Sequence, residues 1–278
     1  MKFSTPVELN TSANPIAYAE PLMMLGSCFT DNIGKKLADD GFNVDINPMG
    51  VLFNPASIAR VVKRAFEQRP YKLDDLYKHD DIWHCLDFAS KRQDVNPDAL
   101  LDSLNRDFAN FARALDNAQT WIITFGTAWL FDHLPTSSLV GNCHKLPAAQ
   151  FERRRLSVDE IVKSWQPLCK GRRVIFTVSP IRHLADGLHG NSLSKATLLL
   201  AVESLCKNGG MEYFPSFEII NDELRDYRFY NADMKHPSQV AIDYIYECFG
   251  NVYFTKETKA KALETRRVTL RLNHSTIL

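Results

Sequence analysis

The sequence lacks several features that would assign it at once to a broad class. Its 278 residues include 33 basic and 33 acidic side chains, so the formal net charge is zero. Without a basic excess, we expect neither nucleic acid nor an anionic membrane as the main partner. No stretch is long and apolar enough to span a bilayer, and residues 1–6 contain no apolar signal core. These absences predict a cytoplasmic protein whose substrates are small neutral or weakly charged molecules.

Cysteine pairs and metal-binding spacings are also missing. The six cysteines are scattered, with no Cys-x-x-Cys pair and no dense framework, which is typical of free thiols in a reducing compartment. Residues 76–86 are rich in possible metal ligands. However, His79 and His84 are five positions apart, and no second group of ligands follows at a zinc-site interval. We therefore expect no metal and no other cofactor.

The most informative stretch that is present surrounds Ser27. Residues 21–25 (PLMML) form a compact apolar run, as a buried strand does, while Phe29, Ile33 and Leu37 recur at helical spacing. Ser27 is thus predicted at a strand-to-helix turn, at the carboxyl end of a parallel sheet, where α/β proteins bind ligands. Its hydroxyl is a candidate nucleophile. The alternative is that Ser27 only caps the helix, a position that serine favours.

A serine nucleophile needs a base, and the base needs an orienting group. Asp233 and His236 offer such a pair, three residues apart, shortly before a helix predicted after Pro237. In this interpretation Ser27 attacks, His236 takes its proton, and Asp233 fixes the tautomer of the imidazole ring. We expect Cys28, the neighbour of Ser27, to turn inward as a small apolar residue.

The Gly-Ser turn and the late Asp-x-x-His pair together resemble the SGNH hydrolases. Within these, residues 26–30 (GSCFT) are similar to the signature of the GSCFA-domain family, which normally reads Gly-Ser-Cys-Phe-Ala, so Thr30 departs at the last position. Four further phrases, spread between residues 20 and about 250, are similar to that family: residues 47–52 (NPMGVL), 125–129 (FGTAW), 142–145 (NCHK) and 179–182 (SPIR).

The resemblance implies where the oxyanion of an acyl-transfer reaction would bind. The amides of Ser27 and Gly50 are the expected donors, although Gly50 could equally be an ordinary turn glycine. SGNH hydrolases usually carry Gly-x-Asn after the third strand, where this chain has alanine at position 128. We expect Asn142 to replace the missing amide, with Thr127 as the next candidate. The alternative for Asn142 is a side chain that only satisfies its own loop.

Three residues are candidates for substrate binding. Arg182 follows the fourth predicted strand, and its planar guanidinium could bind a carboxylate or phosphate; a solvated loop arginine is the alternative. His84 lies in an insertion that the resemblance places over the site. His144 belongs to the phrase 142–145, which the same resemblance places near it.

The order of elements predicts the architecture. Strands are expected at residues 21–25, 42–46, 120–125, 173–178 and 212–220, alternating with helices. This alternation predicts an α/β fold with a mostly parallel five-stranded sheet between two helical layers, in agreement with the flavodoxin-like fold that the resemblance implies. We expect one domain over residues 1–278, with an N-terminal arm (1–20), an insertion (about 70–95), an irregular lid (129–155) and a C-terminal tail (255–278) that forms a surface helix with a frayed end.

The leading hypothesis for function is a serine esterase that works through an acyl-enzyme, for example on an O-acetyl group of a carbohydrate. The expected partner is a small-molecule or glycan ester; the sequence leaves the oligomeric state open. Two alternatives stay open at this point. One is an acyltransferase using the same serine, and the other is a non-catalytic binding protein on the same fold.

Overall fold

The computed structural model of the chain describes residues 4–207 and 210–275. Its centre is a five-stranded sheet with the order β11-β10-β6-β1-β2, in which every pairing is parallel. The strands are β1 (Leu22–Gly26), β2 (Val44–Ile46), β6 (Thr120–Phe125), β10 (Arg173–Val178) and β11 (Met211–Phe214). The predicted α/β class and five-stranded sheet are confirmed.

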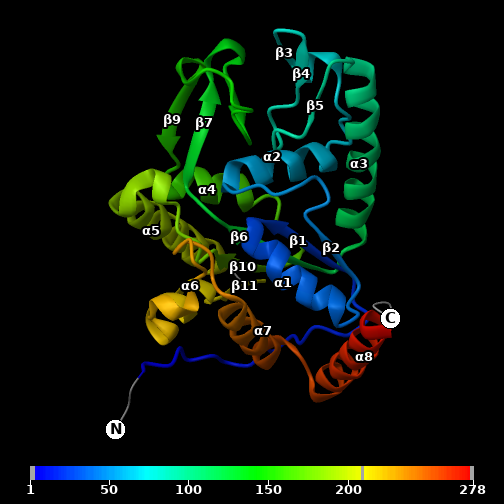
Figure 1. The fold of residues 1–278 in the computed structure, drawn as a ribbon, viewed down its shortest axis with the longest axis vertical. Coiled ribbons are helices and arrows are strands. Elements are labelled where there is room, and N and C mark those ends of the chain that lie inside the picture. The colour runs from blue at the N-terminus through cyan, green and yellow to red at the C-terminus, as the bar shows by residue number, and fades with distance from the viewer. Residues whose placement is uncertain (1–3, 208–209, 276–278) are drawn as a thin grey trace.

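Helices cover both faces of this sheet, as Figure 1 shows. The first face packs against α2 (Pro55–Phe66), α3 (Pro97–Asn117), α4 (Val158–Trp165) and α5 (Gly187–Cys206). The second packs against α1 (Cys28–Asp39) and α7 (Gln239–Tyr253), with α8 (Lys256–Ser275) beside α1. Because side chains alternate along a strand, Met23 and Leu25 enter the first core, whereas Leu22 and Met24 enter the second. Burial on both faces explains why β1 is apolar throughout.

The strand order creates a place for a ligand. From β1 the chain passes to β2 on one side, and it then returns to β6 on the other side of β1. The order therefore reverses between β1 and β6. The loops leaving the carboxyl ends of these two strands run apart, which in open α/β sheets leaves a crevice at that point.

Two small antiparallel sheets stand outside the central one. The predicted insertion contains β3 (Tyr77–His79), β4 (Ile82–His84) and β5 (Gln93–Asp94). The segment 129–155, expected to be irregular, instead forms β7 (Trp129–His133), β8 (Ser138–Val140) and β9 (Phe151–Arg155). The prediction missed this sheet because β9 (FERRR) is mostly exposed and charged, so it has no alternating apolar pattern.

The last strand is shorter than predicted. β11 ends at Phe214 rather than Ile220, because Pro215 has no N–H with which to continue the ladder. Residues beyond it form helical turns, α6 (Ser216–Glu218) and a π-helical turn, Ile219–Leu224. The adjacent buried pair Ile219 and Ile220 had suggested a strand, but a buried helical turn places apolar side chains inward as well.

The two ends of the chain lie against the second helical layer. In the N-terminal arm, Ile16 forms an isolated bridge with Phe254 and is fully buried. At the other end, α8 buries Ala262 in the same core. The expected frayed end falls partly on residues 276–278, outside the described residues. Within residues 4–207 and 210–275, no helix combines the length and apolar character needed to cross a membrane.

Candidate active site

Ser27 occupies the turn between β1 and α1. Gly26 before it has a φ of +147°, and a Cβ there would lie 2.2 Å from the carbonyl oxygen of Thr124, so only glycine fits. The Ser27 side chain is 1% exposed, and its Oγ accepts a hydrogen bond from the N–H of Phe29 at 3.3 Å. Ser27 therefore does cap α1. The same position holds its Oγ beside the partly positive amino end of that helix.

A cavity of about 570 Å³ opens beside Ser27, at the carboxyl ends of the sheet. The loops that follow all five parallel strands contribute to its wall. In strand order these contributions are Ser27 and Cys28, then Phe53 and Asn54, then Thr127, then residues 181–186, and finally Lys235 and His236. The small sheet β7-β8-β9 closes another side with aromatic and polar side chains, so the segment predicted as a lid does border the site.

Asp233 and His236 form the predicted pair. His236 Nδ1 lies 2.5 Å from Asp233 Oδ2, and the backbone N–H groups of Lys235 and His236 donate to Asp233 Oδ1 at 2.9 and 3.0 Å. These hydrogen bonds hold the pKa of the Asp233 carboxyl well below its usual range. A carboxylate at Nδ1 places the ring proton there, which leaves Nε2 as a proton acceptor.

Ser27 and His236 lie in the wall of the same cavity, although 209 positions separate them (236 − 27). The described residues show no hydrogen bond between their side chains. Catalytic hydrogen bonds are often long before substrate binds, so the lack of this bond does not rule out that the two side chains act together.

The structure does not place Gly50 at the oxyanion position. Its N–H donates to the carbonyl oxygen of Asn47 at 2.7 Å, and Gly50 does not line the cavity of Ser27. It is the turn glycine of the alternative interpretation, with a φ of +99°. The loop after β2 reaches the cavity three residues later, through Phe53 and Asn54.

Thr127 lines the cavity, and its backbone donor is already used. Its N–H donates to the carbonyl oxygen of Phe53 at 3.1 Å, and its hydroxyl lies 3.1 Å from the hydroxyl of Ser194, where either group can be the donor. The same hydroxyl accepts the N–H of Trp129. Thr127 therefore supports the loop at the end of β6, and its amide is not available as an oxyanion donor.

Two asparagine side chains line the cavity with their amide nitrogens unengaged by any described residue. Asn142 Oδ1 accepts the N–H of His144 at 2.8 Å, which satisfies its own loop. Asn54 Oδ1 accepts the N–H of Ser57 at 2.8 Å and caps α2. Asn54 is only 5% exposed. Because each Oδ1 is fixed by a backbone donor, each Nδ2 is a remaining donor in the cavity wall. The sequence alone gave no sign that Asn54 would line the same cavity as Ser27.

Cys28 packs against the second core, as expected of a small apolar residue, and it also contributes to the cavity wall. Burial and the nearby Asp31 raise the pKa of its thiol above the usual value. The thiolate is the nucleophilic form of cysteine, so these surroundings make Cys28 a poor nucleophile. The oxygen of Ser27 remains the better candidate.

His84 and His144, which were expected to contact substrate, do not line this cavity. Both are 5% exposed, and their Nδ1 atoms lie 3.1 Å apart. His144 Nε2 donates to the carbonyl oxygen of Phe88 at 2.9 Å, so its neutral Nδ1 is an acceptor and His84 Nδ1 carries the proton between them. Burial lowers the pKa of both imidazoles, and a neutral pair joins the insertion to the segment after β8.

Arg182 lies in the cavity wall, as expected for a substrate-binding residue. Its guanidinium carbon is 4.4 Å from the ring centroid of Tyr230 and 5.2 Å from that of Tyr227. These cation–π contacts hold the guanidinium beside two aromatic rings, which restricts its movement in the cavity wall. Lys235 is held next to it, since the N–H of Arg182 donates to the carbonyl oxygen of Lys235 at 3.3 Å.

Sequence reasoning missed a second group in the wall. Arg153 lies over the Trp129 ring at 4.0 Å and forms an ion pair with Asp186, and all three residues line the cavity. Burial raises the pKa of the Asp186 carboxyl, while Arg153 opposes that rise. The arginine comes from β9 and the aspartate from the loop after β10, so no local pattern could have shown their contact.

Lys195 lies beneath the cavity and was also missed. It is 2% exposed, and its Nζ donates to the carbonyl oxygens of Gly126 and Ser179, each at 2.6 Å. Burial lowers the pKa of this amine to about 7. Near it, burial and the charge of Lys195 lower the pKa of His183 to about 4, so that ring is neutral. Lys195 joins the ends of β6 and β10 immediately behind the serine.

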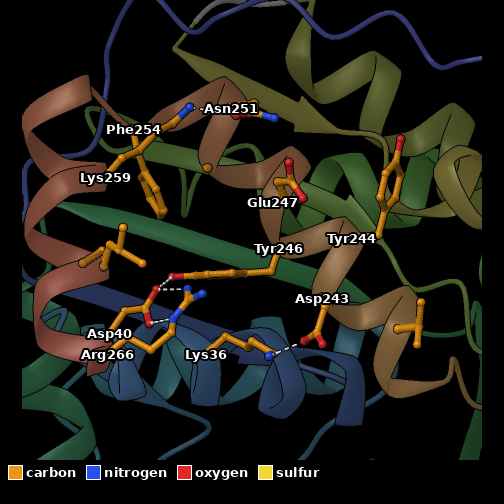
Figure 2. Close-up of a pocket in the computed structure, with 14 residues that line it drawn as sticks. Lys36, Asp40, Asp243, Tyr244, Tyr246, Glu247, Asn251, Phe254, Lys259 and Arg266 are labelled. Carbon is orange, nitrogen blue, oxygen red and sulfur yellow. Dashed lines mark hydrogen bonds and ion pairs between the residues drawn. The ribbon is translucent and has the colours of Figure 1, made fainter. Parts of the chain in front are cut away.

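A second cavity of about 600 Å³ lies on another part of the molecule, between α1, α7 and α8. Figure 2 shows its charged side chains meeting one another: Arg266 and Tyr246 converge on Asp40, and Lys36 pairs with Asp243. No serine or histidine lines it. We therefore place the chemistry in the cavity of Ser27. In the described parts of the chain, no group of three or more His, Cys, Asp or Glu side chains could hold a metal ion.

A comparison with protein families assigns most of the chain to one family. The model of the GSCFA family matches residues 21–249, which spans Ser27, the Asp233–His236 pair and every strand of the central sheet. The chain belongs to the GSCFA family. Searches of curated proteins and of solved structures found no match.

Proposed function

We propose that this protein is a serine hydrolase that cleaves carboxylic esters through an acyl-enzyme. The observation that carries the proposal is that Ser27, at the amino end of α1, and the hydrogen-bonded Asp233–His236 pair line one cavity. Membership of the GSCFA family suggests a hydrolase and supports this assignment.

The proposed reaction follows from these groups. Ser27 Oγ attacks the ester carbonyl carbon, and His236 Nε2 takes the hydroxyl proton. When the carbon–oxygen bond to the alcohol breaks, the imidazolium returns this proton to the leaving oxygen, and the acyl group stays on Ser27. Water then attacks the acyl-enzyme by the same path, releasing the acid. Asp233 keeps the ring in the required tautomer throughout.

The oxyanion needs donors at the amino end of α1. The Ser27 amide and the Nδ2 groups of Asn54 and Asn142 are the candidates, because both asparagines line the cavity and have their Oδ1 atoms already bonded. The aromatic wall formed by Phe53, Trp129 and Phe131 is suited to the flat face of a sugar ring, which supports an O-acetylated carbohydrate as substrate.

A fluorophosphonate probe tests the proposal directly. We expect one covalent adduct on the native protein, located at Ser27 by peptide mapping and absent from Ser27→Ala. Ser103→Ala, on α3 away from the cavity, should label as the native protein does. A label on Cys28 or no label at all would overturn the assignment. Adding an alcohol acceptor to an ester assay distinguishes an acyltransferase, which would form a new ester faster than free acid.

A further inference from the structure

The charges around the cavity differ in whether they have partners. Its negative side chain Asp186 is bound by Arg153. The nearby Asp233 is bound by His236 and by two backbone N–H groups. In contrast, Arg182 and Lys235 line the same cavity, and neither has a carboxylate partner among the described residues. The wall next to His236 therefore carries two positive charges that the protein itself does not neutralise.

The geometry of Arg182 suits it to bind an anion. Its guanidinium lies over the rings of Tyr230 and Tyr227, at 4.4 and 5.2 Å from their centroids. A guanidinium held over aromatic rings can still donate two N–H groups to one carboxylate or phosphate. A main-chain hydrogen bond from Arg182 to Lys235 keeps the two residues adjacent, and both line the cavity.

The place of these cations indicates which part of the substrate carries the charge. His236 must return a proton to the alcohol oxygen of a departing ester, so the alcohol part lies on its side of the cavity. Lys235 directly precedes His236, and Arg182 contacts Lys235. We propose that the natural substrate is an ester whose alcohol part bears a carboxylate or phosphate group, bound by Arg182 and Lys235. This proposal rests on the proposed esterase function.

Matched aryl acetates test the substrate class. 3-Acetoxybenzoate and 3-acetoxybenzamide differ in charge but scarcely in shape, and 3-acetoxyphenyl phosphate provides the phosphate arm. We expect kcat/KM to be about tenfold or more higher for at least one anion than for the amide, because a charge-assisted hydrogen bond is worth more than a neutral one. In Arg182→Gln this ratio should fall toward one, and in Lys235→Gln it should fall partly. Arg113→Gln, an exposed arginine on α3, should keep the native ratio.

A binding measurement separates this proposal from the esterase assignment. Calorimetric titration with 3-hydroxybenzoate, 3-hydroxybenzamide and 3-hydroxyphenyl phosphate needs no turnover. Tighter binding of an anion than of the amide, lost in Arg182→Gln, would support the anion site even if no ester were hydrolysed. Hydrolysis with no preference for either anion would leave the esterase standing and overturn the substrate class. If neither hydrolysis nor binding favoured an anion over the amide, the proposed substrate class would be overturned as well.

Discussion

The Nζ of Lys195 lies 2.6 Å from the carbonyl oxygen of Gly126, the residue that follows β6 and adjoins Ser27. A Cβ on Gly126 would lie 3.2 Å from the Cβ of Ser27, so the buried ammonium is separated from the serine by a single layer of backbone. No carboxylate forms an ion pair with it among the described residues, and the charge of Asp186 offsets the cost of burial only partly. Hydrogen bonds to two carbonyl oxygens stabilise the charged form only partly, and desolvation lowers the pKa of the amine to about 7.

This lysine should make stability depend on pH in a defined window. Its folded pKa of about 7 lies below the ordinary value of 10.5, so between these values the unfolded chain binds a proton that the folded chain does not. The contribution of this lysine to the free energy of unfolding therefore rises by more than about 1 kcal/mol as pH increases from about 7 to 10.5. Urea denaturation across this range should show a pH-dependent difference between the native protein and Lys195→Met. The difference between the native protein and the exposed Lys170→Met should not change with pH. A difference for Lys195→Met that also stayed constant with pH would refute the lowered pKa.

Asp233→Asn should abolish most activity without unfolding the protein. The amide oxygen can still accept the backbone N–H groups of Lys235 and His236, so the turn should persist. Its NH₂ group, however, would face Nδ1 of His236 and favour the wrong tautomer. We expect kcat on an activated ester to fall by roughly 10³–10⁴, as the corresponding change does in serine proteases, with little change in KM.

The control for that experiment is Asp226→Asn, which alters an exposed aspartate outside the cavity wall. It should retain native kcat. If Asp233→Asn also retained native kcat, the carboxylate would have no part in the reaction, and His236 would act alone or not at all.

Serine substitutions can show which asparagine donates to the oxyanion. Serine caps a helix about as well as asparagine, so Asn54→Ser should leave α2 and the melting temperature nearly unchanged. Its hydroxyl is too short to replace the Nδ2 donor. We expect kcat to fall by about a hundredfold or more in Asn54→Ser, since Phe53 and Gly126 hold this loop against Ser27. Asn142→Ser is the matched comparison. A larger loss in Asn142→Ser would assign the donor to Asn142, and full activity in both would place it elsewhere.

The buried His84–His144 pair should be structural and sensitive to acid. Burial lowers the pKa of both rings from 6.5, so below that pH the unfolded chain binds protons that the folded chain does not. The pair makes its full contribution to the free energy of unfolding above about pH 6.5, and this contribution is lost as pH falls below that value. In His144→Gln, the decrease in unfolding free energy between pH 7.5 and 5 should be about 1 kcal/mol smaller than in the native protein. His189→Gln, on an exposed side chain, should match the native decrease. A large fall in kcat/KM at pH 7.5 for His144→Gln would instead indicate that His144 takes part in substrate binding or catalysis.

These contacts also show what the sequence could and could not reveal. The turn at Ser27 and the Asp233–His236 pair depend on neighbours within a few residues, so local patterns were sufficient to predict both. The contact between His84 and His144 joins positions 60 apart, and the residues alone gave no sign of it. The family resemblance suggested substrate binding for both histidines, whereas their burial favours a neutral structural pair.

Lys195 and Gly50 also depend on contacts that the sequence does not show. The burial of Lys195 was not predicted, and Gly50 does not lie where it was predicted. A lysine next to the apolar centre of a predicted helix would ordinarily reach solvent, and only the packing of α5 against β6 and β10 buries it. Gly50 was expected at the oxyanion because a glycine follows the second strand. The loop is three residues longer than that expectation required, so Phe53 and Asn54 reach the cavity instead.

The ion pair between α8 and α1 should contribute measurably to stability. Asp40 is 2% exposed, and Arg266 donates to both of its oxygens, from Nε at 2.6 Å and from Nη2 at 2.5 Å (Figure 2). Tyr246 adds a third hydrogen bond at 2.7 Å. Arg266→Met would leave the buried carboxylate with Tyr246 as its only side-chain partner. We expect a loss of about 2–4 kcal/mol in unfolding free energy, toward the lower end because the arginine is itself 43% exposed.

Two further variants determine the origin of that loss. Arg267→Met, on the neighbouring exposed side chain, should change stability by less than about 0.5 kcal/mol. The double variant Asp40→Asn/Arg266→Met removes both charges, so it should recover part of the stability lost in Arg266→Met. Recovery would attribute the loss to an unpaired buried charge. If the double variant were less stable than Arg266→Met, the packing of α8 on α1, rather than the carboxylate, would be the main contribution of this contact.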